Sequence, residues 1–399
     1  MAILTTPSVV PWSCRGFLAR VYTLLLAARK KVSAIEHHKF NHDLLLPRVD
    51  PSTGVEDRSD QELAARKYPT ILHVLVHPEL QQVFSTYDER ANCAKRIGRV
   101  AGFGAIGLGF LALGIVAFEQ SADEPSTRKI LIWLSALCGL SCFVISSVGV
   151  LFARRKREWL HHRFMGERIR QFHFQTFVFR LPQILASLKD AEAKSRFETD
   201  RKLWFDTFKG RFIGSVDAEF AHTTQGIADP WLHGASKPTK IREVKELDPL
   251  FDAYYELRIA HQIGYADYKL QNDYRIFSSI PRRQAAVLSN LSFAWIFLLC
   301  VVDIGVLLVG DLGVNAANVV ICIALAALAT RAIEQGLQPE REVERYQQYL
   351  SDLRAISDRF NDEDASQAEK IQIMFEMERL VYDEMRNFFL TNERASFVM

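Results

Sequence analysis

The chain has 399 residues, of which 49% are hydrophobic and 24% are charged. This hydrophobic share is high for a purely soluble protein of that charge, and charged residues are nearly absent from four windows, which is typical of a polytopic membrane protein. The formal net charge of +2 points to no class of partner. The six cysteines stand singly, which excludes a disulfide framework or a zinc module with paired ligands.

We predict a cytosolic N-terminal region over residues 1–78. Its early apolar run, residues 21–28, is short and is followed by basic residues, unlike a secretory signal peptide. Residues 15–31 instead predict a basic amphipathic helix that either lies on the inner membrane face or packs on the body of the protein. Proline, glycine and acidic residues without a period predict a linker over residues 44–60.

Two apolar runs, residues 100–118 and 130–152, organise the next segment, residues 79–181. Neither run contains Asp, Glu, Lys or Arg, and at ~1.5 Å rise per residue each is long enough to cross a hydrocarbon layer of ~30 Å. The polar turn between them predicts a transmembrane hairpin. Pro78 suits a first helical turn, so we expect a helix that begins there and continues directly into the first run.

Glycines within residues 102–107 match the spacing G-x-G-x-x-G of a dinucleotide-binding loop. Such a loop belongs to a soluble βαβ unit, whereas these glycines lie inside an apolar run. The pairs Gly98 with Gly102 and Ala105 with Gly109 have the small-xxx-small spacing that lets membrane helices approach closely. We therefore expect these positions to serve helix packing, with no cofactor.

Residues 154–180 predict a helix that continues from the second run and carries eight Lys or Arg against two Glu. Trp159, Arg163, Glu167 and Arg170 fall at i, i+4, i+8 and i+11, so they share one helical face. The positive charge is either the solvated flank of a membrane span or a surface available to anionic lipid or to an acidic partner.

Two membrane helices with a short loop, a basic stop and the pattern W-x3-R-x3-E-x-I-R resemble the SLATT group of bacterial two-transmembrane effector domains. In this resemblance Trp159, Arg163, Glu167 and Arg170 occupy the recurring positions, and Gly166 stands where alanine is more usual. The resemblance implies an effector that forms homo-oligomers and pores, or otherwise perturbs the membrane, in a nucleotide-signalling defence context. A separate nucleotide-sensing protein would then be the trigger, because no sensing domain is recognisable in this chain.

Residues 182–249 predict a cytosolic connecting region with two helices, in which residues 229–238 form a loop. Helical periodicity next predicts a long helix over residues 250–278. Arg282 and Arg283 then precede a second hairpin, with apolar runs at residues 285–309 and 314–330 and a tight turn between them. The long helix and the second hairpin together form one predicted segment, residues 250–337.

The last segment, residues 338–399, is predicted to be helical, acidic and cytosolic. An apolar stripe on this tail predicts packing against another helix or a coiled-coil seam between subunits. The stripe consists of Met374, Met377, Val381, Met385 and Phe388. Because opposite charges steer docking, a further hypothesis is that the basic helix of residues 154–180 docks on this acidic tail.

The sequence therefore predicts an all-α fold with four transmembrane helices in two hairpins. Basic flanks belong in the cytosol, so both termini and residues 154–283 are expected inside, in a multi-pass protein of the cell (inner) membrane. The loop around Asp123 is expected outside.

Asp303 is the ionisable residue inside the apolar runs, and such residues are costly in a bilayer. In an antiparallel hairpin its position lies close to that of Asn318. One interpretation is a hydrogen bond between Asp303 and Asn318 that locks the hairpin; the other places Asp303 on a cation-selective pore shared between subunits.

No phosphate loop, nucleophile elbow or zinc knuckle is present, so we predict neither an enzyme nor a nucleic-acid-binding protein. His38 and His42 have an i, i+4 spacing next to His37, but not the H-E-x-x-H order of a zinc hydrolase, and we predict no metal. The leading expectation is a non-enzymatic membrane effector. An ion channel or transporter, and a membrane-anchored scaffold that recruits a cytosolic partner, remain as alternatives.

Overall fold

The computed structural model describes residues 42–49, 56–119, 121–122, 124–213, 229–235, 237–238, 243–271, 280–309 and 314–394. The chain divides into two compact units, Met1–Pro69 and Thr70–Met399. The predicted amphipathic helix at residues 15–31 lies outside the described residues. Every segment predicted beyond residue 79 belongs to the second unit.

The described part of the first unit holds a short turn, a small ladder and one helix. The 3-10 turn η1 covers His42–Leu44. Strands β1, Arg48–Val49, and β2, Glu56–Asp57, pair antiparallel, and helix α2, Ser59–Lys67, follows them. The predicted linker thus contains two strands of two residues each. All other described elements of regular structure are helical, in agreement with the predicted all-α class.

Two very long helices open the second unit after the short helix α3, Leu72–Leu75. Helix α4, Pro78–Glu119, has 42 residues, and α5, Pro125–Phe179, has 55. Each combines an apolar run with a polar flank without a break. Proline stands at the first position of both helices, where its missing N–H costs nothing. The predicted helix from Pro78 into the first run is confirmed.

The second apolar pair consists of α11, Pro281–Val309, and α12, Val314–Leu337. Among the described residues, four helices are long and apolar enough to cross a membrane, within Leu72–Glu119, Pro125–Ser147, Pro281–Gly305 and Ala317–Phe360. At most 22% of any of these apolar windows is buried, so their surfaces suit a lipid environment. The prediction of a multi-pass membrane protein agrees with this finding.

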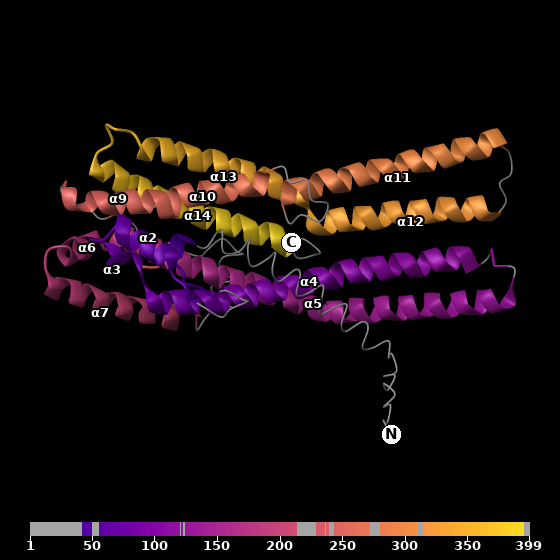
Figure 1. The fold of residues 1–399 in the computed structure, drawn as a ribbon, viewed down its shortest axis with the longest axis horizontal. Coiled ribbons are helices and arrows are strands. Elements are labelled where there is room, and N and C mark those ends of the chain that lie inside the picture. Colours follow the sequence, from indigo (N-terminus) through magenta and orange to yellow (C-terminus); the bar gives the residue numbers. More distant parts are fainter. Residues whose placement is uncertain are drawn as a thin grey trace, which may run out of the picture. The chain divides into compact units, whose positions relative to one another are not determined.

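We call the remaining helices, with the polar parts of α4 and α5, the helical body. Its further elements are α6, Leu181–Ser187, α7, Ala191–Phe208, η2, Lys209–Ile213, η3, Lys245–Leu247, α9, Asp248–Tyr254, η4, Tyr255–Ala260, α10, His261–Leu270, α13, Pro339–Phe360, and α14, Gln367–Arg394. In Figure 1, α4 with α5 and α11 with α12 extend from the same end of this body. Helix α14 packs on α5, and α13 packs on both α10 and α14.

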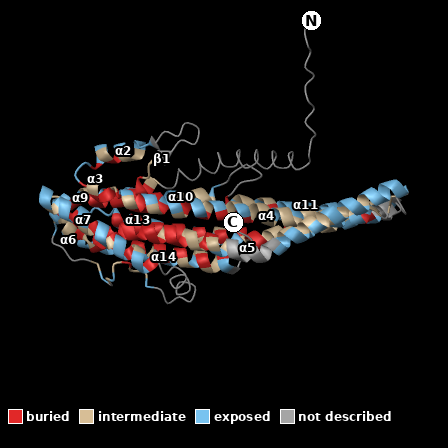
Figure 2. Cartoon of the chain, turned by 90° about the horizontal axis from the view of Figure 1, so that it is seen from below, coloured by how far each residue is buried: buried red, intermediate tan, exposed pale blue. Residues whose placement is uncertain are grey.

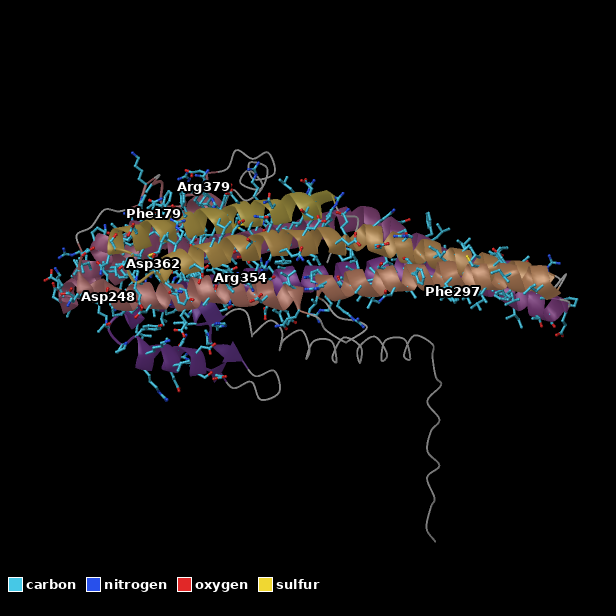
Figure 3. The ribbon with its side chains drawn as sticks, turned by 90° about the horizontal axis from the view of Figure 1, so that it is seen from above. Phe179, Asp248, Phe297, Arg354, Asp362 and Arg379 are labelled. Carbon is cyan, nitrogen blue, oxygen red and sulfur yellow. The ribbon has the colours of Figure 1, made fainter. Side chains whose placement is uncertain are left out.

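Burial separates the two regions of the second unit. Figure 2 shows the buried residues gathered in the helical body and the exposed residues along the apolar pairs. From Trp159 to Phe179, α5 is almost continuously buried, so it forms the centre of the body. Figure 3 shows Phe297, which is 62% exposed, on the projecting part of α11, far from Phe179 in the body.

Small residues bring the apolar helices together. A Cβ added at Gly109 would lie 3.4 Å from Cys142 Sγ, and this thiol donates to the carbonyl oxygen of Ala105 at 3.3 Å. The predicted packing role of Ala105 and Gly109 is confirmed. Helix α12 also packs along α4, where a Cβ at Gly114 would lie 3.9 Å from Cys322 Sγ.

One predicted helix boundary was wrong. The long helix after residue 250 ends at Leu270, because Gln271 adopts an extended conformation, and residues 272–279 lie outside the described part. The tail, which was predicted to be helical, contains two helices, α13 and α14. A capping box starts the second, since Glu369 N–H donates to Ser366 Oγ at 3.3 Å and Ser366 N–H donates to the Glu369 carboxylate at 2.8 Å.

Candidate functional site

The charged face predicted on α5 forms a buried ionic network. Glu167 accepts two hydrogen bonds from Arg170 Nη1, both at 2.8 Å, and pairs with Arg163 Nη2 at 2.7 Å. Arg163 also lies 3.6 Å from the carboxylate of Asp88 on α4. Burial alone would raise the pKa of Glu167, but Arg170 and Arg163 outweigh it and lower this pKa to about 2. The network therefore stays ionised and ties α5 to α4.

Trp159 belongs to the apolar core beside this network. Its side chain is 3% exposed, and its ring meets Phe388 of α14 edge-on at 5.7 Å between centroids. The ammonium of Lys95 lies 5.9 Å from the Trp159 centroid. Trp159 thus joins three helices, and the four predicted positions on α5 serve the contacts of this helix with α4 and α14.

The predicted availability of the basic helix to lipid was wrong for most of its length. Arg168 is fully buried and Arg170 is 4% exposed, because the aromatic residues around them come from helices on every side. The predicted docking of the acidic tail on this helix is confirmed, and it uses aromatic and cation–π contacts together with a hydrogen bond from Lys156 Nζ to the Glu393 carbonyl at 2.6 Å. Phe164 meets Phe389 of α14 at 5.2 Å between centroids, and Arg168 lies 5.2 Å from the Tyr382 ring.

A second ion pair, absent from the sequence predictions, lies deeper in the body. Arg258 Nε and Nη2 donate to the two carboxylate oxygens of Glu378 at 2.9 and 2.8 Å, and both side chains are 0% exposed. Tyr254 Oη donates to the same carboxylate at 2.9 Å. Although burial would lower the pKa of Arg258, Glu378 raises it, so the guanidinium stays charged. No local pattern could reveal this pair, because its partners are far apart in the sequence.

A π-helical segment carries Arg258. Residues Tyr255–Ala260 form η4 between α9 and α10, and π turns inside α-helices change the direction in which side chains project. The guanidinium also lies 4.5 Å from the centroid of Phe174 on α5. Helices α5, α14 and the helix that precedes the second apolar pair therefore meet at one fully buried charge.

The loop predicted at residues 229–238 packs against α5 in its described part, where Leu232 is buried. Gln175 Nε2 donates to the Pro230 carbonyl at 2.7 Å, and Leu232 N–H donates to Gln175 Oε1 at 2.9 Å. Arg168 Nη2 donates to the Asp229 carbonyl at 3.0 Å. Polar side chains of α5 thus satisfy the buried backbone of the described part of this loop, residues 229–235 and 237–238.

His233 follows in the same loop and stacks on Phe172 at 4.8 Å between centroids. Its Nε2 lies 3.2 Å from Thr176 Oγ1. Burial lowers the pKa of His233 to about 4, with the Phe172 carbonyl opposing this shift. The imidazole is therefore neutral at pH 7.

The predicted bond between Asp303 and Asn318 is not the contact that the structure shows for Asn318. Its amide donates to Ser121 Oγ, next to the end of α4, instead, and its side chain is 4% exposed. Asp303 is exposed on α11, with no hydrogen bond or ion pair to any described residue. An antiparallel register predicts only that the two residues lie at a similar depth in the hairpin. It does not determine the direction in which each side chain projects from its helix.

The histidines considered as metal ligands do not form a site in the described part of the chain. His42 is described, whereas His37 and His38 lie outside the described residues. Among the described residues no group of three or more His, Cys, Asp or Glu side chains is arranged to hold a metal ion.

Comparison of the chain with models of protein families, with curated proteins and with solved structures finds no match. The resemblance to the SLATT group stays a prediction from the residues that carry it.

Proposed function

We propose that the chain is a non-enzymatic effector of the bacterial inner membrane that assembles with further copies of itself and permeabilises or reorganises that membrane when triggered. The observation that carries this proposal is the exposure of Asp303 on a helix apolar enough to span a bilayer. Asp303 lies six residues, or ~9 Å, before the end of α11.

A carboxylate in hydrocarbon is expensive, by ~2.5–3.5 kcal/mol at a helix centre and less near an interface. Asp303 is exposed and has no hydrogen bond or ion pair with a described residue, so its polar surroundings have to come from water or from another copy. A face shared between copies supplies both, because facing carboxylates attract water and cations into the contact.

The contacts inside one chain support an ion path between neighbouring copies of the chain rather than an ion path through a single copy. Side-chain bonds among the described apolar helices join Trp295 Nε1 to Thr330 Oγ1 at 3.1 Å and Asn318 to Ser121. These bonds and the small residues at the α4–α5 contact close the gaps between helices. Ions would therefore cross where several copies meet, at the face of α11 that carries Asp303.

The packing of the tail favours an effector over a scaffold. Met374 and Met377 are 0% exposed, and Val381 and Met385 are 5% exposed, so the apolar stripe that a scaffold would offer to a partner is covered by the chain itself. We place the two hairpins in the inner membrane with the helical body in the cytosol, and a separate nucleotide-sensing protein as the trigger.

Induced expression with a membrane-potential dye tests the proposal. We expect the wild-type chain to depolarise the membrane and Asp303→Asn to depolarise it several-fold less at equal membrane content, because the amide keeps the shape but loses the charge. Asp358→Asn, on the exposed surface of the body, is the matched control and should behave as the wild type. Full depolarisation by Asp303→Asn would refute a role for this carboxylate.

A further inference from the structure

One face of α4 carries three charged residues as it approaches its apolar run. Asp88, Lys95 and Arg99 fall at i, i+7 and i+11, so they share a helical face. Asp88 faces Arg163, whereas Lys95 is half-buried and makes no ion pair or hydrogen bond with a described residue. The Lys95 ammonium instead lies above the Trp159 ring.

Helix α10 adds a second such lysine to the same place. Lys269 is half-buried, and its ammonium lies 5.4 Å from the Tyr265 centroid and 5.8 Å from the Tyr268 centroid. It likewise has no ion pair or hydrogen bond with a described residue. Cation–π contacts of this kind leave the three N–H donors of an ammonium free for an anion.

Electrostatic contacts show that these cations converge. Lys95 is subject to repulsion from Arg99, Lys269 and Arg163 and to a smaller attraction from Glu342. Tyr265 gives independent support, because burial would raise its pKa, yet Lys269 and Arg163 outweigh burial and lower it. Basic groups of α4, α5 and α10 therefore lie near enough to one another for their charges to interact.

The carboxylates nearby pair with arginines, and only one oxygen of Glu342, Oε1, has no hydrogen-bond partner in the described part of the chain. Glu167 and Asp88 pair with Arg163, and Glu342 accepts from Arg345 Nη2 at 2.6 Å. A cluster of like charges that share one half-buried position is stabilised by a bound anion.

The position of these basic residues relative to the membrane indicates which kind of anion they bind. Lys95 lies five residues before the apolar run that begins at Val100, or ~7.5 Å along the helix. The headgroup layer on each side of a bilayer is ~5–8 Å thick. Lys95 and Arg99 therefore lie at the depth of lipid phosphates when the run crosses a membrane.

We propose that Lys95, Arg99 and Lys269 form a site for the phosphate group of an anionic phospholipid between α4 and α10. The ammonium and guanidinium groups donate to the phosphate oxygens, and the acyl chains continue along the apolar helices. The site requires only that the apolar runs lie in a membrane, so it stands independently of pore formation.

Native mass spectrometry of the full chain released from nanodiscs tests the site. The discs contain phosphatidylcholine with a small fraction of phosphatidylglycerol, and the readout is the number and apparent affinity of retained phosphatidylglycerol molecules. The variants are Lys95→Gln, Lys269→Gln and their combination. Lys129→Gln, an exposed lysine near the start of α5, makes the same charge change at the opposite end of the apolar run.

We expect one tightly retained phosphatidylglycerol per chain in the wild type and in Lys129→Gln. Each of the other lysine variants should bind it about fivefold more weakly, and the double variant should retain none. Equal retention by all variants would overturn the site. A second arm titrates inorganic phosphate into discs of pure phosphatidylcholine and follows the thermal midpoint: no stabilisation supports the lipid, whereas stabilisation that Lys95→Gln abolishes would assign the site to a soluble phosphate and overturn the proposal.

Discussion

Arg258 and Glu378 join two parts of the body through charges that have no access to water. Breaking such a pair leaves one buried charge uncompensated, which costs ~3–5 kcal/mol, whereas replacing both partners by apolar residues is often nearly neutral. We expect Arg258→Met and Glu378→Met each to destabilise strongly. The double variant should be far less destabilised than the sum of the two, as measured by unfolding in detergent in a double-mutant cycle.

An exposed arginine provides the control for this cycle. Arg354 on α13, labelled in Figure 3, pairs with Asp267 at 3.1 Å and is 60% exposed. Since exposed pairs contribute ~0–1 kcal/mol, Arg354→Met should change the free energy of unfolding by no more than that. Similar losses for Arg258→Met and Arg354→Met would contradict a special role for the buried pair.

His233 makes the stability of the body dependent on pH. Its pKa is about 4 in the folded chain against an ordinary value of 6.5, so between these values the unfolded chain binds more protons. The free energy of unfolding should therefore be highest above pH 6.5 and fall as the pH drops toward 4, with a share for His233 of up to ~3 kcal/mol. Thermal midpoints recorded from pH 7.5 to 4 measure this decline.

His233→Gln isolates the contribution of this imidazole. Glutamine keeps a polar group near Thr176 but does not titrate, so the decline between pH 6.5 and 4 should become shallower. The loss below about pH 4.5 that comes from protonating Glu167 should remain, because the pKa of that carboxyl is lowered to about 2 by its arginine partners. An unchanged slope between pH 6.5 and 4 would show that His233 is accessible to protons in the folded chain.

At the scale of elements, the contact between α4 and α5 depends on the lack of a side chain at Gly109. A leucine there would push against Cys142, whereas a Cβ at Gly104 would meet no heavy atom within 4 Å. We expect Gly109→Leu to lower the thermal midpoint in detergent by several degrees through overpacking. Gly104→Leu adds the same side chain to the same helix and should leave the thermal midpoint nearly unchanged. Equal changes in the midpoint of the two variants would mean that helix propensity, rather than the contact with Cys142, determines the effect.

The ends of the elements show which local signals carry structural information. Pro78 and Pro125 mark helix starts that sequence rules predict well. The spacing S-x-x-E at Ser366 and Glu369 also signals a helix start, and the apolar stripe of the tail lies entirely within the helix that begins there. By contrast, Gln338 adopts a left-handed conformation with φ of 49° between α12 and α13, and nothing local in the sequence announces that bend except Pro339.

At the scale of the whole molecule, the orientation of the four apolar helices is the main expectation still to be measured. Reporters fused after Arg157, near Ser236 and at Met399 should all report the cytosol, and one at Asp123 should report the outside. The basic residues at the inner ends of the helices provide the reason. A signal from outside the membrane at Ser236 would contradict the arrangement of two hairpins.

The sequence determined the helices and their apolar runs because both follow from periodicity and composition over short windows. It also placed Trp159, Arg163, Glu167 and Arg170 on one face, since helical spacing is local. The sequence did not predict which residues these side chains contact in the folded protein. Arg258 and Glu378, or Asn318 and Ser121, meet only after helices from different parts of the chain have packed, and no local pattern specifies such pairs.

The central position of α5 has a consequence for the synthesis of the chain. The face of α5 that carries Trp159 and Phe164 contacts Phe388 and Phe389 of α14, which are translated long after α5. At ~5–20 residues per second, the ribosome needs tens of seconds to reach them after α5 is made. During that interval the first apolar pair can enter the membrane while its aromatic continuation remains open to chaperones and proteases. Synthesis of α14 thus covers this face of α5, and a product truncated before α14 would present the cell with a persistent aromatic surface.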